Sequence, residues 1–182
     1  VQVEDAAGAM KMATVVSGQH VEATAVTFRH LALLAQTKKN DSDVWTSLQA
    51  SGALKEITPQ LQDRLTRMRY WIQSDHFPSE MRINILTEPN NAMLEALDEV
   101  ERRILNSLVV ALNACEWNAT AIGASIPQSA KDLDESPRSA FKVAYAALMG
   151  TEKGPRLAPI LAEMDREVIL HLLDASVQVL GN

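Results

Sequence analysis

The sequence predicts an all-α protein, a cage of about eight to ten helices. Apolar residues recur at helical spacing along most of the chain, and strand-like alternation is limited to RINIL at 82–86. Alanine, leucine, methionine, glutamate and glutamine are plentiful, and all five favour helix. Because 47% of the 182 residues are apolar, the chain can bury a core, which argues against an intrinsically disordered protein.

Four helices are predicted in the first half of the chain. Residues 3–16 have helical spacing but no N-cap, and residues 27–38 carry their apolar side chains on one side. Asn40 caps a short helix that Gly52 ends, and Thr58, followed by a proline, opens the next. That last helix has a stripe of Leu61, Leu65, Met68 and Ile72.

Five more helices are predicted in the second half, with bounds set by capping residues, Gly and Pro. They cover 91–115, 119–126, 136–150, 157–163 and 165–180. Glu101 falls inside the apolar stripe of the first of these. A buried carboxylate needs a cation, so we expect a salt bridge to another helix or local exposure of this one.

Two breaks separate these halves, HFPSEM at 76–81 and TEPNN at 87–91. We place a boundary between the two breaks, which divides the chain into two predicted helical subdomains, 26–86 and 87–182. Residues 1–25 are interpreted as a linker or an N-terminal helix.

Charge and cysteine content limit the partners. The net charge of −6 argues against a protein whose whole surface binds nucleic acid, and we expect no DNA partner. A local basic patch on an acidic body is still allowed. Cys115 is the single cysteine, which favours a reducing, cytoplasmic location. The sequence contains neither an apolar run long enough to span a bilayer nor the features of a signal peptide, so we expect no membrane partner.

No motif for catalysis or metal binding is present. The four histidines, His20, His30, His76 and His171, have no ligand partner at a convincing spacing. The sequence also lacks a Walker loop, a GxGxxG fingerprint and a GxSxG nucleophile elbow. We therefore expect no catalytic residue, no metal and no cofactor in this chain.

One helix combines basic and aromatic residues, RLTRMRYW at 64–71. At about 100° per residue, Arg64, Arg67 and Trp71 share the flank beside its apolar stripe. Such a flank suits phosphate contact with base stacking. The alternative is that Trp71 extends the core and the arginines cover it or pair with acids.

A second basic site is the turn that contains Lys153 and Arg156, held by Gly154 and Pro155. A rigid cationic turn between helices can bind phosphate, although solvated charges on a stiffened turn explain it equally well. Arg138 and Lys142 lie one helical turn apart just upstream and extend the candidate patch.

Read in order, five segments resemble the C-terminal part of class I lysyl-tRNA synthetases. They are VTFRHLALLAQ (26–36), RLTRMRYWI (64–72), PSEMRINI (78–85), CEWNATAIGASI (115–126) and SPRSAFKVAYAALMGTEKGPRLAPILAEMDREVILHLL (136–173). The likeness spans about 26–180. Each segment alone is weakly specific, and their shared order and spacing carry the resemblance.

The resemblance implies an α-helical cage that recognises the anticodon stem-loop of tRNA-Lys. The parent enzyme would join lysine to its tRNA with ATP, and its catalytic domain, absent from this chain, would bind both substrates. The RNA contacts would come from Arg64, Arg67, Trp71, Arg138, Lys142, Lys153 and Arg156. The alternative function is an all-helical protein–protein interaction or scaffold domain that keeps this fold without tRNA recognition.

Overall fold

The computed structural model describes residues 26–181, and all regular structure in that range is helical. Nine α-helices and one 3-10 turn account for it, which confirms the all-α prediction for these residues. The alternating segment at 82–86 has no regular secondary structure in the described residues, although it begins extended at Arg82. The helix predicted over 3–16 lies outside the described residues.

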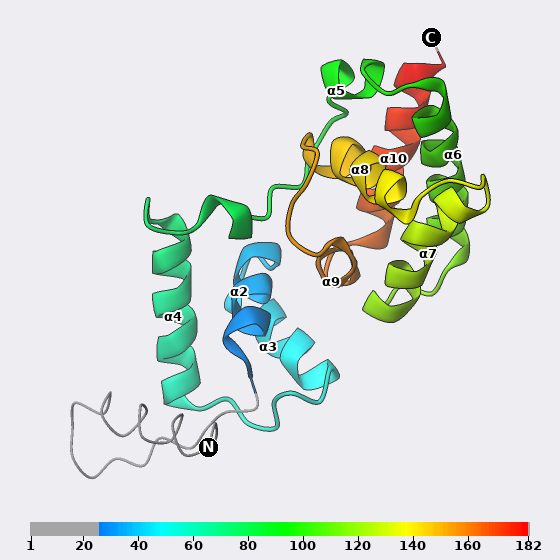
Figure 1. The fold of residues 1–182 in the computed structure, drawn as a ribbon. Helices are drawn as coiled ribbons and strands as arrows, with labels where there is room; N and C mark the ends of the chain where they lie inside the picture. The colour runs from blue at the N-terminus through cyan, green and yellow to red at the C-terminus, as the bar shows by residue number, and fades with distance from the viewer. Residues whose placement is uncertain (1–25, 182) are drawn as a thin grey trace, which may run out of the picture.

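The first three helices form one group (Figure 1). They are α2 (Phe28–Thr37), α3 (Asp41–Ala50) and α4 (Pro59–Gln73). Each begins at a side chain, Thr27, Asn40 or Thr58, which accepts a hydrogen bond from the backbone N–H three residues later. These caps satisfy N–H groups that have no intrahelical partner, and they fix where each helix starts.

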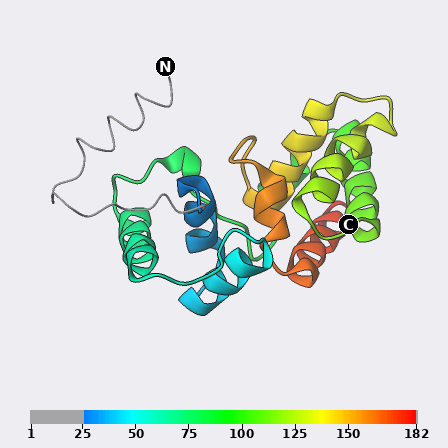
Figure 2. The same cartoon turned by 90° about the horizontal axis from the view of Figure 1, so that it is seen from below.

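The remaining elements form a second group that lies beside the first in two perpendicular views (Figures 1 and 2). A 3-10 turn in the connecting segment is followed by six helices. The bounds are η1 (Ser79–Met81), α5 (Asn91–Glu95), α6 (Glu99–Ala114), α7 (Ala119–Lys131), α8 (Pro137–Met149), α9 (Leu157–Ala162) and α10 (Arg166–Leu180).

Two predicted helix bounds are wrong. The helix expected over 91–115 is divided, because Asp98 forms a capping box with Glu101 and starts α6 anew. The helix expected to end at 126 continues to Lys131 with Pro127 inside it. Packing of α7 against α6, α8 and α9 offsets the hydrogen bond that the proline lacks.

Most of the buried apolar side chains fall into two clusters, one in each group. The first cluster contains side chains between Val26 and Met68 and the second contains side chains between Leu94 and Leu173. The subdomain boundary at residue 86 stays a prediction, although each cluster draws its buried side chains from one side of it.

Polar contacts join the groups. Lys38, which follows α2, forms an ion pair with Glu163 after α9, with 3.1 Å between Nζ and Oε2. Gln36 of α2 donates to the carbonyl of Met81 and accepts from the N–H of Ile83, which holds the connecting segment against α2. Further along that segment, the N–H of Leu86 donates to the carbonyl of Leu148 at 2.8 Å.

Arg69 joins α4 to the end of α2. Its guanidinium donates to the carbonyls of Ala35 and Lys38 and to the carboxylate of Asp41. Ala35 lies in the last turn of α2 and Lys38 is its C-cap, and neither carbonyl has an intrahelical N–H partner. Arg67, two residues earlier, pairs only with Asp63 among the described residues, and both side chains are exposed.

Glu101 has the cationic partner that its position requires. Its side chain is buried, with the residue 9% exposed, and Lys142 of α8 donates to Oε1 at 2.6 Å. The other carboxylate oxygen accepts from the N–H of Asp98. The hydrogen bond to Glu101, followed by the charges of Glu101, Glu152 and Asp98, raises the pKa of Lys142 despite partial burial.

We expect Lys142→Met to lower the free energy of unfolding by about 1–2 kcal/mol at neutral pH, because it leaves the Glu101 carboxylate without its cation. A raised lysine pKa stabilises the fold below the unfolded value and loses that effect as pH rises through the folded value. The deficit should therefore shrink above pH 10.5, the ordinary lysine pKa. Urea unfolding of both proteins at neutral and strongly alkaline pH measures it, and an equal deficit at both would contradict the ion pair's role.

The two neighbouring arginines of α4 should differ in stability. Arg69→Met should cost about 2 kcal/mol, because it leaves helix-terminal carbonyls unbonded. Arg67→Met is the matched control and should stay within about 0.5 kcal/mol, since it removes only an exposed i,i+4 pair. Denaturant titrations of the two variants test this, and equal losses would show that the carbonyl contacts of Arg69 contribute nothing.

Candidate nucleic-acid interface

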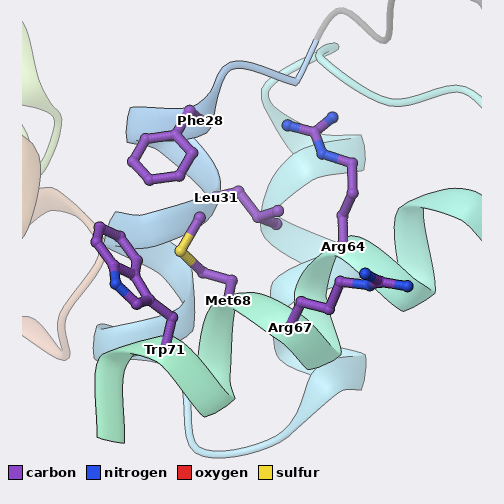
Figure 3. Close-up of a pocket in the computed structure, with 6 residues that line it drawn as sticks. All are labelled: Phe28, Leu31, Arg64, Arg67, Met68 and Trp71. Atoms are coloured by element: carbon purple, nitrogen blue, oxygen red, sulfur yellow. The ribbon is translucent and has the colours of Figure 1, made fainter. Parts of the chain in front are cut away.

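A groove lies between α2 and α4, on the flank predicted from the sequence. It has a volume of about 260 Å³ and is lined by Phe28, Leu31, Arg64, Arg67, Met68 and Trp71. Figure 3 shows the aromatic rings on one wall, the two arginines on the other, and Leu31 with Met68 between them. An apolar floor between aromatic and cationic walls suits a nucleic-acid base whose phosphate stays outside.

Trp71 belongs both to the groove and to the core. Its ring centroid lies 5.6 Å from that of Phe28 and 4.7 Å from that of Phe77, the latter edge-on. The indole is half-buried and packs against the first apolar cluster. Trp71 therefore packs against the core, and its role in RNA contact stays a prediction.

The two arginines of the groove differ in their contacts. Arg64 is half-buried, and its guanidinium lies 3.4–3.5 Å from the carbonyl oxygen of Val26. Arg67 is exposed, with its Nε 2.8 Å from Oδ2 of Asp63. Arg64 thus also helps to hold the start of α2, whereas Arg67 keeps most of its surface open to solvent.

The second candidate site is the turn after α8. Gly150 ends the helix with a positive φ of 63°, and the hydroxyl of Tyr145 lies within hydrogen-bond distance of the carbonyls of Gly154 and Pro155. Burial raises the pKa of Tyr145, so the hydroxyl stays protonated and can donate. A Cβ on Gly154 would lie 3.1 Å from the tyrosine ring, so glycine allows the turn to approach it closely.

Lys153 and Arg156 extend from this anchored turn. Both side chains are exposed, and neither has a hydrogen-bond or ion-pair partner among residues 26–181. Their charges are therefore available for phosphate. Their role in RNA binding stays a prediction.

The other two predicted contacts lie on α8 itself. Lys142 is engaged by Glu101 and also feels the charge of Glu152, so a phosphate would have to compete with carboxylates there. Arg138 is exposed in the first turn of α8. A 13-residue helix is about 20 Å long, which places Arg138 far from the turn at 150–156. These two residues stay predictions as well.

The predicted contacts thus fall into separate places. Arg64, Arg67 and Trp71 share the groove on the first group of helices, whereas the turn belongs to the second (Figure 1). The structure adds Phe28, which is 49% exposed. Phe28 stands in the first turn of the helix predicted over 27–38, where an apolar ring has little helix around it to pack against. This position could have indicated an exposed aromatic contact from the sequence alone.

Other kinds of site are not found in the part of the chain that the structure describes. No group of three or more histidine, cysteine, aspartate or glutamate side chains is placed to hold a metal ion there. No helix between residues 26 and 181 is both long and apolar enough to cross a membrane.

Comparison with known proteins supports the resemblance. A family model described as an anticodon binding domain matches residues 25–176. The chain is 29% identical over 146 residues to the lysine–tRNA ligase of Picrophilus torridus. It is 28% identical over 153 residues to that of Pyrococcus horikoshii, and 26% over 142 residues to that of Thermoplasma volcanium.

These matches cover 80%, 80% and 78% of this chain but only 28%, 28% and 27% of the three ligases. The chain thus spans little more than a quarter of the relatives' length. The resemblance to the C-terminal part of class I lysyl-tRNA synthetases is confirmed. Since the family model matches well over half of the chain, this protein belongs to the anticodon binding domain family.

Proposed function

We propose that this chain is the anticodon-binding module of a class I lysine–tRNA ligase and recognises the anticodon stem-loop of tRNA-Lys. Membership in an anticodon binding family implies binding to tRNA. The match over residues 25–176 is the observation that carries the proposal. Lysine specificity is inferred from the names of the similar ligases.

The parent protein would attach lysine to its tRNA with ATP in the cytoplasm. ATP and lysine would bind a catalytic domain of the same polypeptide, outside these residues. This chain would contribute binding energy and the choice of tRNA, and it would perform no chemical step.

The recognition mechanism combines two kinds of contact. An unpaired base of the anticodon loop enters the groove of α2 and α4 and stacks against its aromatic wall. Lys153 and Arg156 contact phosphates, with their turn held by Tyr145. A turn that is ordered before binding loses little conformational freedom when the RNA arrives.

The proposal is tested by measuring the affinity of the chain for an unmodified tRNA-Lys transcript and for one whose anticodon uridines are replaced. We expect tighter binding to the first, by about tenfold or more if one well-placed base contact is lost in the second. Both affinities should fall with salt, because phosphate contacts release counterions.

Equal binding to both transcripts would contradict anticodon recognition. Absence of binding would favour the alternative, a protein-interaction domain that uses the apolar groove for a partner. A tRNA of unrelated anticodon serves as the control for non-specific attraction.

The cations of the turn should determine the salt dependence. For each of Lys153→Gln and Arg156→Gln, we expect the slope of log affinity against log salt to become shallower by about 0.7–0.9, the value for one lost phosphate contact. Arg103→Gln is the matched control, since Arg103 is an exposed arginine on α6 and does not belong to the turn. Titrations at several salt concentrations measure the slopes, and unchanged slopes in both turn variants would exclude the turn as a phosphate site.

A further inference from the structure

Tyr70 is the most exposed large apolar side chain in the described part of the protein, at 79%. It lies on α4, on the side of the helix opposite the buried Leu61, Leu65 and Met68. Its hydroxyl has no hydrogen-bond partner among residues 26–181. Packing therefore does not explain an aromatic ring at this position.

Arg67 lies next to Tyr70 on the helix surface. Residues three apart are neighbours on a helix surface. Arg67 lines the groove together with Trp71, and it therefore lies between the groove and Tyr70. The aromatic wall, the Arg67 guanidinium and the Tyr70 ring thus follow one another around α4. The flank predicted from the sequence includes Arg67 as a phosphate contact and does not include Tyr70.

The contact with Asp63 changes what Arg67 can do. Its Nε donates to the Asp63 carboxylate at 2.8 Å, which engages one edge of the guanidinium, while the side chain stays 79% exposed. The carboxylate offsets the positive charge and repels an approaching phosphate. A planar guanidinium held at its edge keeps its faces open, and such faces stack on nucleic-acid bases.

We propose that Tyr70 and Arg67 form a second stacking surface on the outer face of α4, which receives an unpaired base of the bound RNA. The inference rests on the proposed function and adds a site to it. Trp71 already packs against two other rings, whereas the ring of Tyr70 is exposed. An anticodon loop crossing α4 would place one base in the groove and an adjacent base on this surface.

The test uses the 182-residue chain and a tRNA-Lys anticodon stem-loop transcript. Tyr70→Ala should weaken binding by about fivefold or more, the lower end of the range for one stacked base. Tyr70→Phe should stay within about twofold of the wild type, because the ring is retained. The salt slope should not change in either variant, since no phosphate contact is lost.

Arg67→Lys separates stacking from phosphate contact. Lysine keeps the charge but lacks the planar group, so stacking predicts a loss of affinity, and phosphate binding predicts little change. Val168→Ala is the matched control, since Val168 is 57% exposed on α10, in the other group of helices. Thermal melts should show that all variants stay folded, because each replaced side chain is exposed.

The outcomes distinguish this inference from the proposed function. If the wild type binds tRNA-Lys selectively and Tyr70→Ala binds it equally well, the second stacking surface is overturned. The proposed function as an anticodon-binding module then still stands. Equal losses in Tyr70→Ala and Tyr70→Phe, or a shallower salt slope, would indicate a hydroxyl–phosphate contact and overturn stacking. A wild-type chain that binds no tRNA-Lys overturns both.

Discussion

Backbone carbonyls at the C-terminal ends of four helices accept hydrogen bonds from arginine side chains of other segments. The arginines are Arg69 for α2, Arg82 for α4, Arg102 for α5 and Arg166 for α6. The last four carbonyls of a helix have no intrahelical donor, and one guanidinium can serve two of them at once. These contacts fix where each helix ends relative to the segment that carries the arginine, and the groove between α2 and α4 depends on that placement.

Arginines that bind helix-terminal carbonyls are less available for contact with RNA. The chain has 17 lysines and arginines against 23 aspartates and glutamates, and the arginines at helix ends are already engaged. Exposed cations without partners, such as Lys153 and Arg156, are therefore local features on an acidic body. Such a body repels RNA elsewhere, so binding is confined to places where a cation or an exposed ring faces solvent.

The helix starts at Asn40 and Thr58 could be predicted because each depends on a side chain and an N–H only three residues apart. The start of α6 at Asp98 depends on an equally local cap but was not predicted, because the apolar stripe continues through it. The roles of Arg67 and Arg69 could not be separated, since the carbonyls that bind Arg69 lie more than 30 residues earlier in the sequence. The flank of α4 followed from helical periodicity alone. Phe28, which shares the aromatic wall with Trp71, comes from α2, and its place there required the packing of α2 against α4.

Several residues of the candidate interface have a packing role as well, and this double use favours recognition. Trp71 is held by two rings, and Tyr145 anchors the turn that presents Lys153. Side chains fixed in the free protein lose little entropy on binding, so a modest contact area can still discriminate between bases. A fixed geometry also excludes loops whose bases do not match it. The specificity of this acidic cage for RNA would thus depend more on the fixed positions of its aromatic rings and cations than on their number.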